Sequence, residues 1–158
     1  MKLRGRIDRV DQVTGTGGWQ VWDYKTSSLY EYNSVWRLSR GTKLQHVIYT
    51  RALNEMLRRR GIRGKVECSG YYFPTGKGGG ARIARDCAPG ELEHALGQLF
   101  DVIGNGWFPV PNDGKCAFCE FRDLCGDDEA AAERMARKQQ ANANDPAVQA
   151  WRRLQEVE

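Results

Sequence analysis

Two strand-like segments joined by a glycine-rich turn begin the sequence and constrain its fold most strongly. Residues 3–13 are rich in apolar and β-branched side chains, and residues 19–25 alternate in polarity. Between them, the run TGTGG at residues 14–18 is typical of a turn, because glycine accepts backbone angles that other residues resist. The pattern predicts a β-hairpin over residues 3–25.

The rest of the sequence predicts alternating helices and strands. Residues 27–42 are irregular and polar, whereas residues 43–60 place apolar side chains on one helical stripe and end in three arginines. Further along, the pattern predicts strands at 65–73 and 81–85, a helix at 91–103, and polar helices from residue 127 onward. Asp145 is expected to cap a last helix, with Pro146 at its first position. This order predicts an α/β fold.

Length and composition limit the class of protein. The chain has 158 residues, of which 41% are hydrophobic and 28% charged, which is enough for one folded domain. It contains no apolar run long enough to cross a membrane and begins with no secretory leader, so the cytoplasm is the expected compartment. The net charge is +4, and arginine outnumbers lysine. Guanidinium groups suit phosphate ligands, but an ordinary solvated surface explains this balance equally well.

Three charged residues of the predicted hairpin are expected to meet. Asp23 and Lys25 are two positions apart in one strand, so their side chains share a face. Pairing Asp8 with one or the other centres the turn at position 15.5 or 16.5, within the glycine-rich run. Two carboxylates on rigid strands suit Mg²⁺, and a neighbouring lysine can position water or stabilise charge on phosphorus. Cross-strand ion pairs are the alternative. Asp11, on the opposite strand face from Asp8, is expected to be an ion-pair partner rather than a metal ligand.

These residues belong to a pattern that resembles a known family. The segment GRIDRVD at residues 5–11, followed by DYKT at residues 23–26, is similar to the PD-(D/E)XK nuclease superfamily, and in particular to its RecB-like exonuclease branch. Gln45 and Tyr49, in the run QHVIY, match the Q-x-x-x-Y motif of that branch. The resemblance implies a restriction-endonuclease-like core, in which a mixed central β-sheet is flanked by helices.

The resemblance also implies a role for each matching residue. The implied ligands of Mg²⁺ or Mn²⁺ are Asp8, Asp23 and the backbone carbonyl of Tyr24. Lys25 would be the catalytic lysine. Gln45 and Tyr49 lie one helical turn apart and would contact DNA and the active site. Without the upstream motifs, Tyr49 would be interpreted as a core aromatic residue and Gln45 as a helix-surface residue.

Three of the five cysteines are clustered, namely Cys116, Cys119 and Cys125. An odd number of cysteines in a cytoplasmic chain argues against a disulfide framework, and three thiolates at this spacing indicate zinc or part of an iron–sulfur cluster. The spacing is similar to that of AddB-type and CRISPR-associated RecB-like nucleases, which implies a 4Fe-4S cluster. In those nucleases a fourth cysteine lies upstream of the catalytic strands, and no cysteine precedes the hairpin here. Cys68 and Cys87 are expected to be small buried residues, and His94 is a weak candidate ligand.

We expect a nuclease core at residues 1–111, a cysteine cluster at 112–126 and a helical extension at 127–158. Because the family core begins with a helix before the first strand, the chain is expected to be the C-terminal part of a larger nuclease, or a truncated reading frame. The resemblance implies a metal-dependent deoxyribonuclease of the exonuclease type in DNA recombination or repair, with DNA as substrate, a helicase subunit or domain as partner, and no membrane. The alternative is a non-catalytic DNA-binding module stabilised by a cysteine-bound metal.

Overall fold

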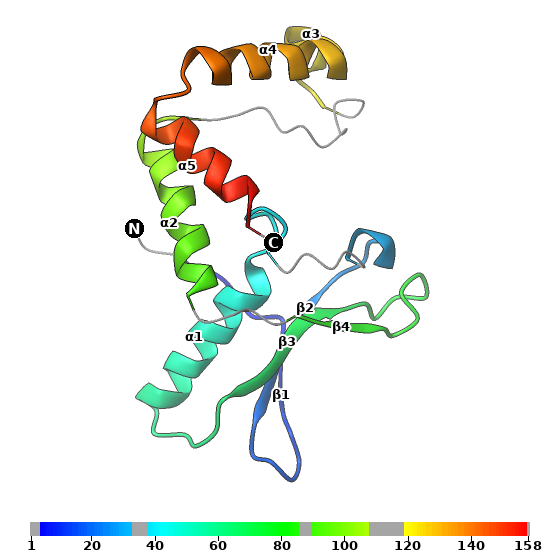
Figure 1. Cartoon of the computed structure of the whole chain (residues 1–158). Coiled ribbons are helices and arrows are strands. Elements are labelled where there is room, and N and C mark those ends of the chain that lie inside the picture. Colours follow the sequence, from blue (N-terminus) through cyan, green and yellow to red (C-terminus); the bar gives the residue numbers. More distant parts are fainter. Residues whose placement is uncertain (1–3, 33–37, 86–89, 108–118, 158) are drawn as a thin grey trace. The chain divides into compact units, whose positions relative to one another are not determined.

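The computed structural model describes residues 4–32, 38–85, 90–107 and 119–157 (Figure 1). The strands are β1 (Arg9–Gln12), β2 (Trp19–Tyr24), β3 (Val66–Tyr72) and β4 (Arg82–Ala84). The helices are the short 3₁₀ helix η1 (Leu29–Tyr32), α1 (Gln45–Arg59), α2 (Glu91–Gly104), α3 (Arg122–Cys125), α4 (Asp128–Ala141) and α5 (Pro146–Gln155). The chain forms two compact units, one at residues 1–94 and 157–158 and the other at 95–156.

The four strands form one mixed sheet in the order β1-β2-β3-β4. β1 and β4 run antiparallel to their neighbours, whereas β2 and β3 are parallel and are connected through α1. Parallel neighbours need a crossover of this kind, because a tight turn can join only antiparallel strands. The sheet with its helices confirms the predicted α/β class and is consistent with a restriction-endonuclease-like fold.

The hairpin has the register that would place Asp8 opposite Asp23. Partner residues of β1 and β2 run from Arg9 with Trp22 to Gln12 with Trp19, so their numbers add up to 31 throughout. β1 is shorter than the predicted strand at residues 3–13, because its ladder begins only at Arg9. At Asp8, the residue before Arg9, the backbone pairing is replaced by a side-chain bond, because the Tyr24 N–H donates to the Asp8 carboxylate at 3.0 Å.

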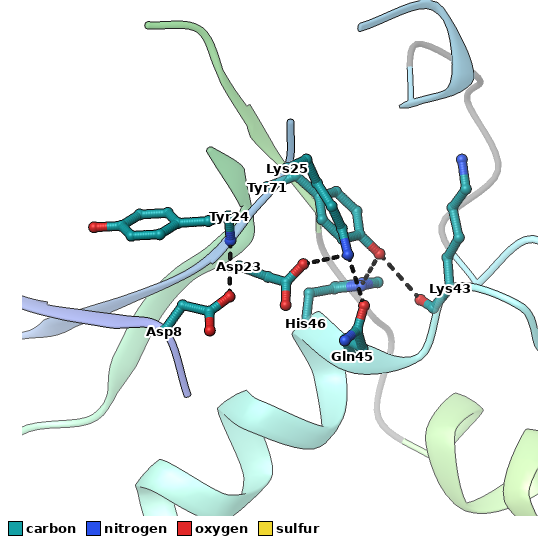
Figure 2. Close-up of polar contacts among 8 residues, drawn as sticks. All are labelled: Asp8, Asp23, Tyr24, Lys25, Lys43, Gln45, His46 and Tyr71. Carbon is teal, nitrogen blue, oxygen red and sulfur yellow. Dashed lines mark hydrogen bonds and ion pairs between the residues drawn. The ribbon is translucent and has the colours of Figure 1, made fainter. Parts of the chain in front are cut away.

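Helix α1 packs on one face of the sheet and forms the core of the first unit. Its buried Leu53 and Leu57 meet the buried Val21 of β2. The predicted helix at 43–60 therefore matches α1 closely. Of its apolar side chains Val47 and Leu57 are buried as the pattern predicted, whereas Met56 is exposed. The helix is thereby anchored with its first residue, Gln45, near the end of β2 (Figure 2).

The second unit has a core of its own. Val102 and Trp107 pack with Ala147, Val148 and Ala150 of α5. Asp145 caps α5 as predicted, since its carboxylate accepts the Ala147 N–H at 2.8 Å and Pro146 takes the first helical position. The C-terminal segment thus contributes a buried helix face to this core.

No helix within the described residues combines the length and the apolar character that a membrane crossing requires.

Candidate active site

Two carboxylates meet where β1 begins and β2 ends. Asp23 points into the α1 side of the sheet and is only 3% exposed. Asp8, just before β1, is held by the Tyr24 N–H (Figure 2). Burial raises the pKa of Asp23, the Lys25 ammonium lowers it, and the charge of Asp8 raises it further, with a net increase. This corner of the sheet therefore has two carboxylates, Asp8 and Asp23, and one ammonium, Lys25, to balance them.

Lys25 connects this carboxylate corner to the start of α1. Its Nζ lies 2.5 Å from Asp23 Oδ2 and donates a hydrogen bond to Gln45 Oε1 at 2.9 Å (Figure 2). Burial lowers the pKa of Lys25, but the hydrogen bond and charge of Asp23 outweigh it, so the pKa lies above its ordinary value. Lys25 is therefore a charged ammonium held between a β-strand end and a helix start.

An aromatic wall lies against the Lys25 ammonium, and the sequence did not predict it. Lys25 Nζ is 5.6 Å from the ring centroid of Tyr71 and 5.9 Å from that of Tyr32. The two rings pack together at 4.6 Å, and Tyr32 also contacts the ring of Phe73 at 5.3 Å. Ring faces attract a cation, and the attraction grows as water is removed, so the wall helps to hold the ammonium in place.

The 3₁₀ helix η1 brings Tyr32 to this wall. Lys43 donates a hydrogen bond to the backbone carbonyl of Glu31, and Arg85 donates one to the carbonyl of Tyr32. The Lys43 ammonium also lies 4.2 Å from the centre of the Tyr32 ring. Two cations from distant parts of the chain thus fasten a segment that is irregular in sequence.

The hydroxyl group of Tyr71, one of the two rings of this wall, forms a buried polar pair with His46. The Nδ1 atom of His46 lies 3.2 Å from the Tyr71 hydroxyl, which donates to the Lys43 carbonyl at 3.4 Å (Figure 2). His46 is fully buried and Tyr71 is 1% exposed. Burial is the main cause that raises the pKa of Tyr71, so its hydroxyl stays protonated. The alternation of β3 and the position of His46 beside Gln45 were the signals that could have pointed to this pair.

Tyr49 lies one turn along α1 from Gln45 and packs against the core cluster of Val21, Leu53 and Leu57. The structure thus brings Gln45 to Lys25, while Tyr49 has the surroundings of a core aromatic residue. Asp11 is an ion-pair partner as expected, because both of its oxygens accept from Arg9 Nε at 2.8 Å.

The chemistry of the donors in this corner suits a hard divalent cation. Carboxylate oxygens come from Asp8 and Asp23, and Mg²⁺ takes few protein oxygens and keeps several waters. Burial and the charge of Asp8 raise the pKa of Asp23, and a bound cation would stabilise the ionised form of this carboxylate. Within the described residues, no group of three or more His, Cys, Asp or Glu side chains could hold a metal ion, so the corner provides two carboxylates and not a complete side-chain cage.

The cysteine segment is described only in part. Cys116 lies outside the described residues, as does Cys87. Cys119 is an exposed free thiol, and Cys125, at the end of α3, is a half-buried one. Cys68 is half-buried in β3, and His94 is exposed on α2.

A mixed sheet thus holds two carboxylates, a lysine and a helix glutamine at one corner. A family model described as the PD-(D/E)XK nuclease superfamily matches residues 1–126. The chain belongs to this superfamily of metal-dependent nucleases. A search of curated proteins and a search of solved structures each found no match.

Proposed function

We propose that the chain is a metal-dependent deoxyribonuclease whose active site is the corner formed by Asp8, Asp23, Lys25 and Gln45. The observation that carries the proposal is the buried Asp23, which has Lys25 at 2.5 Å and the charge of Asp8 beside it. Membership of the nuclease superfamily supports the same function.

Asp8, Asp23 and the backbone carbonyl of Tyr24 are the proposed ligands of Mg²⁺ or Mn²⁺. In an extended strand the N–H and C=O of one residue point to the same side. The Tyr24 N–H is bonded to Asp8, and this supports a carbonyl on the Asp8 side of β2. The bound ion would lower the pKa of a coordinated water and polarise the phosphodiester.

The remaining residues of the site position groups around the phosphate. Lys25 is a charged donor because Asp23 raises its pKa, so its proposed role is to stabilise negative charge on the phosphate and to orient water. Gln45 accepts one Lys25 hydrogen bond and thereby fixes the direction of the ammonium. For Tyr49, which is half-buried against the core, the proposed contact with DNA rests on the Q-x-x-x-Y motif alone.

Three further proposals rest on the sequence motifs. We propose that the chain cleaves DNA from its ends, and that it acts in recombination or repair with a helicase subunit or domain. We also propose a structural iron–sulfur cluster bound by Cys116, Cys119 and Cys125. Purified protein with the cluster would be brown with a charge-transfer absorption band, and Cys125→Ser would remove the colour. A colourless protein that releases zinc would contradict the cluster.

Asp23→Asn tests the proposed active site, because the amide keeps the shape of the side chain and removes its charge. We expect cleavage of linear DNA with Mg²⁺ to fall at least a hundredfold while circular dichroism stays unchanged. Asp101→Asn is the matched control, since Asp101 is an exposed aspartate on α2. Unchanged cleavage by Asp23→Asn would refute this site and favour a DNA-binding module without catalysis.

A further inference from the structure

The sheet face opposite α1 carries a row of arginine and tyrosine side chains. The register places Arg9 opposite Trp22 and Tyr24 beside Tyr72, which in turn lies beside Arg82. Because side chains alternate along a strand, all five share the face opposite to the buried Val21. We call the set of Arg9, Tyr24, Tyr72 and Arg82, with Trp22 beneath them, the arginine–tyrosine face.

The two arginines of this face lie over aromatic rings. The guanidinium carbon of Arg82 is 5.0 Å from the centre of the Tyr72 ring and 5.2 Å from that of Trp22. That of Arg9 is 5.5 Å from the centre of the Tyr72 ring. A guanidinium stacked on a ring keeps its charge and its edge N–H donors, which match the oxygens of a phosphate. Arg82 is exposed, so its donors are accessible to a ligand.

The tyrosines add an apolar surface to this charge. The rings of Tyr24 and Tyr72 pack edge to face with 5.6 Å between their centroids. Tyr24 is 43% exposed although β2, which it ends, has a neighbouring strand on each side. Trp22 is 3% exposed and forms the floor below Arg82. Rings and guanidinium groups side by side on an open sheet offer stacking for bases and ion pairs for phosphates at once.

The face also borders the proposed active site. Tyr24 stands between Asp23 and Lys25 in the chain, and its N–H holds Asp8. Figure 2 shows its ring pointing away from Lys25, so the strand end has the reacting groups on one side and the ring on the other.

From this arrangement we propose that the arginine–tyrosine face binds a single-stranded nucleic acid, with bases on the tyrosine rings and phosphates on Arg82, since Arg9 is already paired with Asp11. A duplex hides the faces of its bases and can offer only phosphates here, whereas a single strand offers both. The inference rests on the proposed nuclease function and extends it, because it names single strands as the substrate class of the same site.

Fluorescence anisotropy with a labelled thymidine oligonucleotide of about 20 nucleotides, measured in EDTA, tests the proposal. We expect Arg82→Ala and Tyr72→Leu each to weaken binding of the single strand about tenfold. Tyr72→Leu should change binding of a duplex by less than about twofold, because it removes a stacking surface and no phosphate contact. Arg82→Ala should also reduce the dependence of log affinity on log salt by about one unit. Arg82→Lys keeps the charge and should restore the salt dependence but not the full affinity.

Arg137→Ala is the matched control, because Arg137 is an exposed arginine on α4. Single-strand binding by Arg82→Ala and Tyr72→Leu equal to that of the control would overturn the proposal, and so would equal losses for single strand and duplex in Tyr72→Leu. An absence of oligonucleotide binding by the unmodified chain would overturn it too and would favour an acidic protein partner for this face.

Hydrolysis of bis(p-nitrophenyl) phosphate with Mn²⁺ separates the two proposals, because this small diester needs no strand-binding surface. Hydrolysis together with unaltered oligonucleotide binding in Arg82→Ala would overturn the face and leave the proposed function standing. The absence of hydrolysis together with the expected binding losses would overturn the proposed function and support the face as a binding surface.

Discussion

Lys25→Met is the substitution that most directly tests the electrostatics of the site in the absence of metal. The change removes the cation that lies 2.5 Å from Asp23 but keeps a flexible side chain of similar length against the rings of Tyr32 and Tyr71. It leaves a carboxylate that is 3% exposed, with the charge of Asp8 beside it and without a counter-charge. We therefore expect a large loss of stability from lost charge pairing and little from lost packing.

The size of the loss follows from the burial of the pair. Removing one partner of a buried ion pair costs about 3–5 kcal/mol, whereas an exposed pair is worth about 1 kcal/mol or less. The side chain of Asp23 is 4% exposed and that of Lys25 is 20% exposed, which places the pair near the lower end of the buried range. A loss of about 3 kcal/mol corresponds to roughly a 150-fold change in the folding equilibrium and to about 6–12 °C in Tm.

The pH dependence of this loss identifies Asp23 as its source. The folded-state pKa of Asp23 is already raised, so protonation stabilises the folded chain at low pH, and this contribution is lost as pH rises through that pKa. Without Lys25 the pKa rises further, since the ammonium is what lowers it. The destabilisation of Lys25→Met should therefore be full at neutral pH and should shrink as the pH is lowered through the pKa of Asp23.

Urea unfolding in EDTA, followed by circular dichroism, measures the effect at neutral and at acidic pH. The double variant Asp23→Asn with Lys25→Met should recover most of the loss, because it buries no unpaired charge. Lys77→Met, at an exposed lysine in the turn before β4, should change stability by less than about 0.5 kcal/mol. A loss below about 1 kcal/mol for Lys25→Met, or no recovery in the double variant, would refute the reasoning.

Three further substitutions test other parts of the structure. Tyr32→Leu removes a phenol group that raises the pKa of Lys25, so the alkaline limb of the pH–rate profile for DNA cleavage should move to lower pH. Tyr30→Leu is the control, because this side chain of the same η1 is 86% exposed, and it should leave the profile unchanged. Asp145→Ala removes the cap of α5 and should lower the free energy of unfolding by about 0.5–2 kcal/mol in a urea titration; no change would contradict the capping bond. Gly70→Ala should destabilise the chain by about 1–3 kcal/mol in thermal unfolding, since a Cβ there would lie 2.0 Å from the Ile83 carbonyl of β4, whereas Gly76→Ala has open space and should be neutral.

The parts of the fold that the sequence predicted well are those determined locally. The glycine run at residues 14–18 leaves only a few ways to close the hairpin, and the observed register is one of the two that were considered for Asp8. Asp145 and Pro146 act within a single turn of helix, so their capping role could be predicted without knowledge of the core.

The parts that could not be predicted depend on contacts between distant segments. Tyr32 reaches the site because Lys43 and Arg85 bond to the backbone of η1, and no local pattern indicates either bond. Tyr71 faces the site only because β3 pairs in parallel with β2 in a register that sets it beside Asp23. Sequence periodicity places Tyr71 on a buried face, but it does not select the strand beside it.

The charge balance of the site explains how burial and metal binding are related. Asp8, Asp23 and Lys25 together carry a net charge of −1 when all three are ionised, and the excess falls on a carboxylate that burial already disfavours. A ligand that binds only the folded chain returns stability in proportion to the logarithm of its concentration over its Kd. Mg²⁺ should therefore raise the Tm of the unmodified chain. The increase should be smaller for Asp23→Asn, because this substitution removes a proposed metal-coordinating carboxylate and the excess negative charge that the ion would balance.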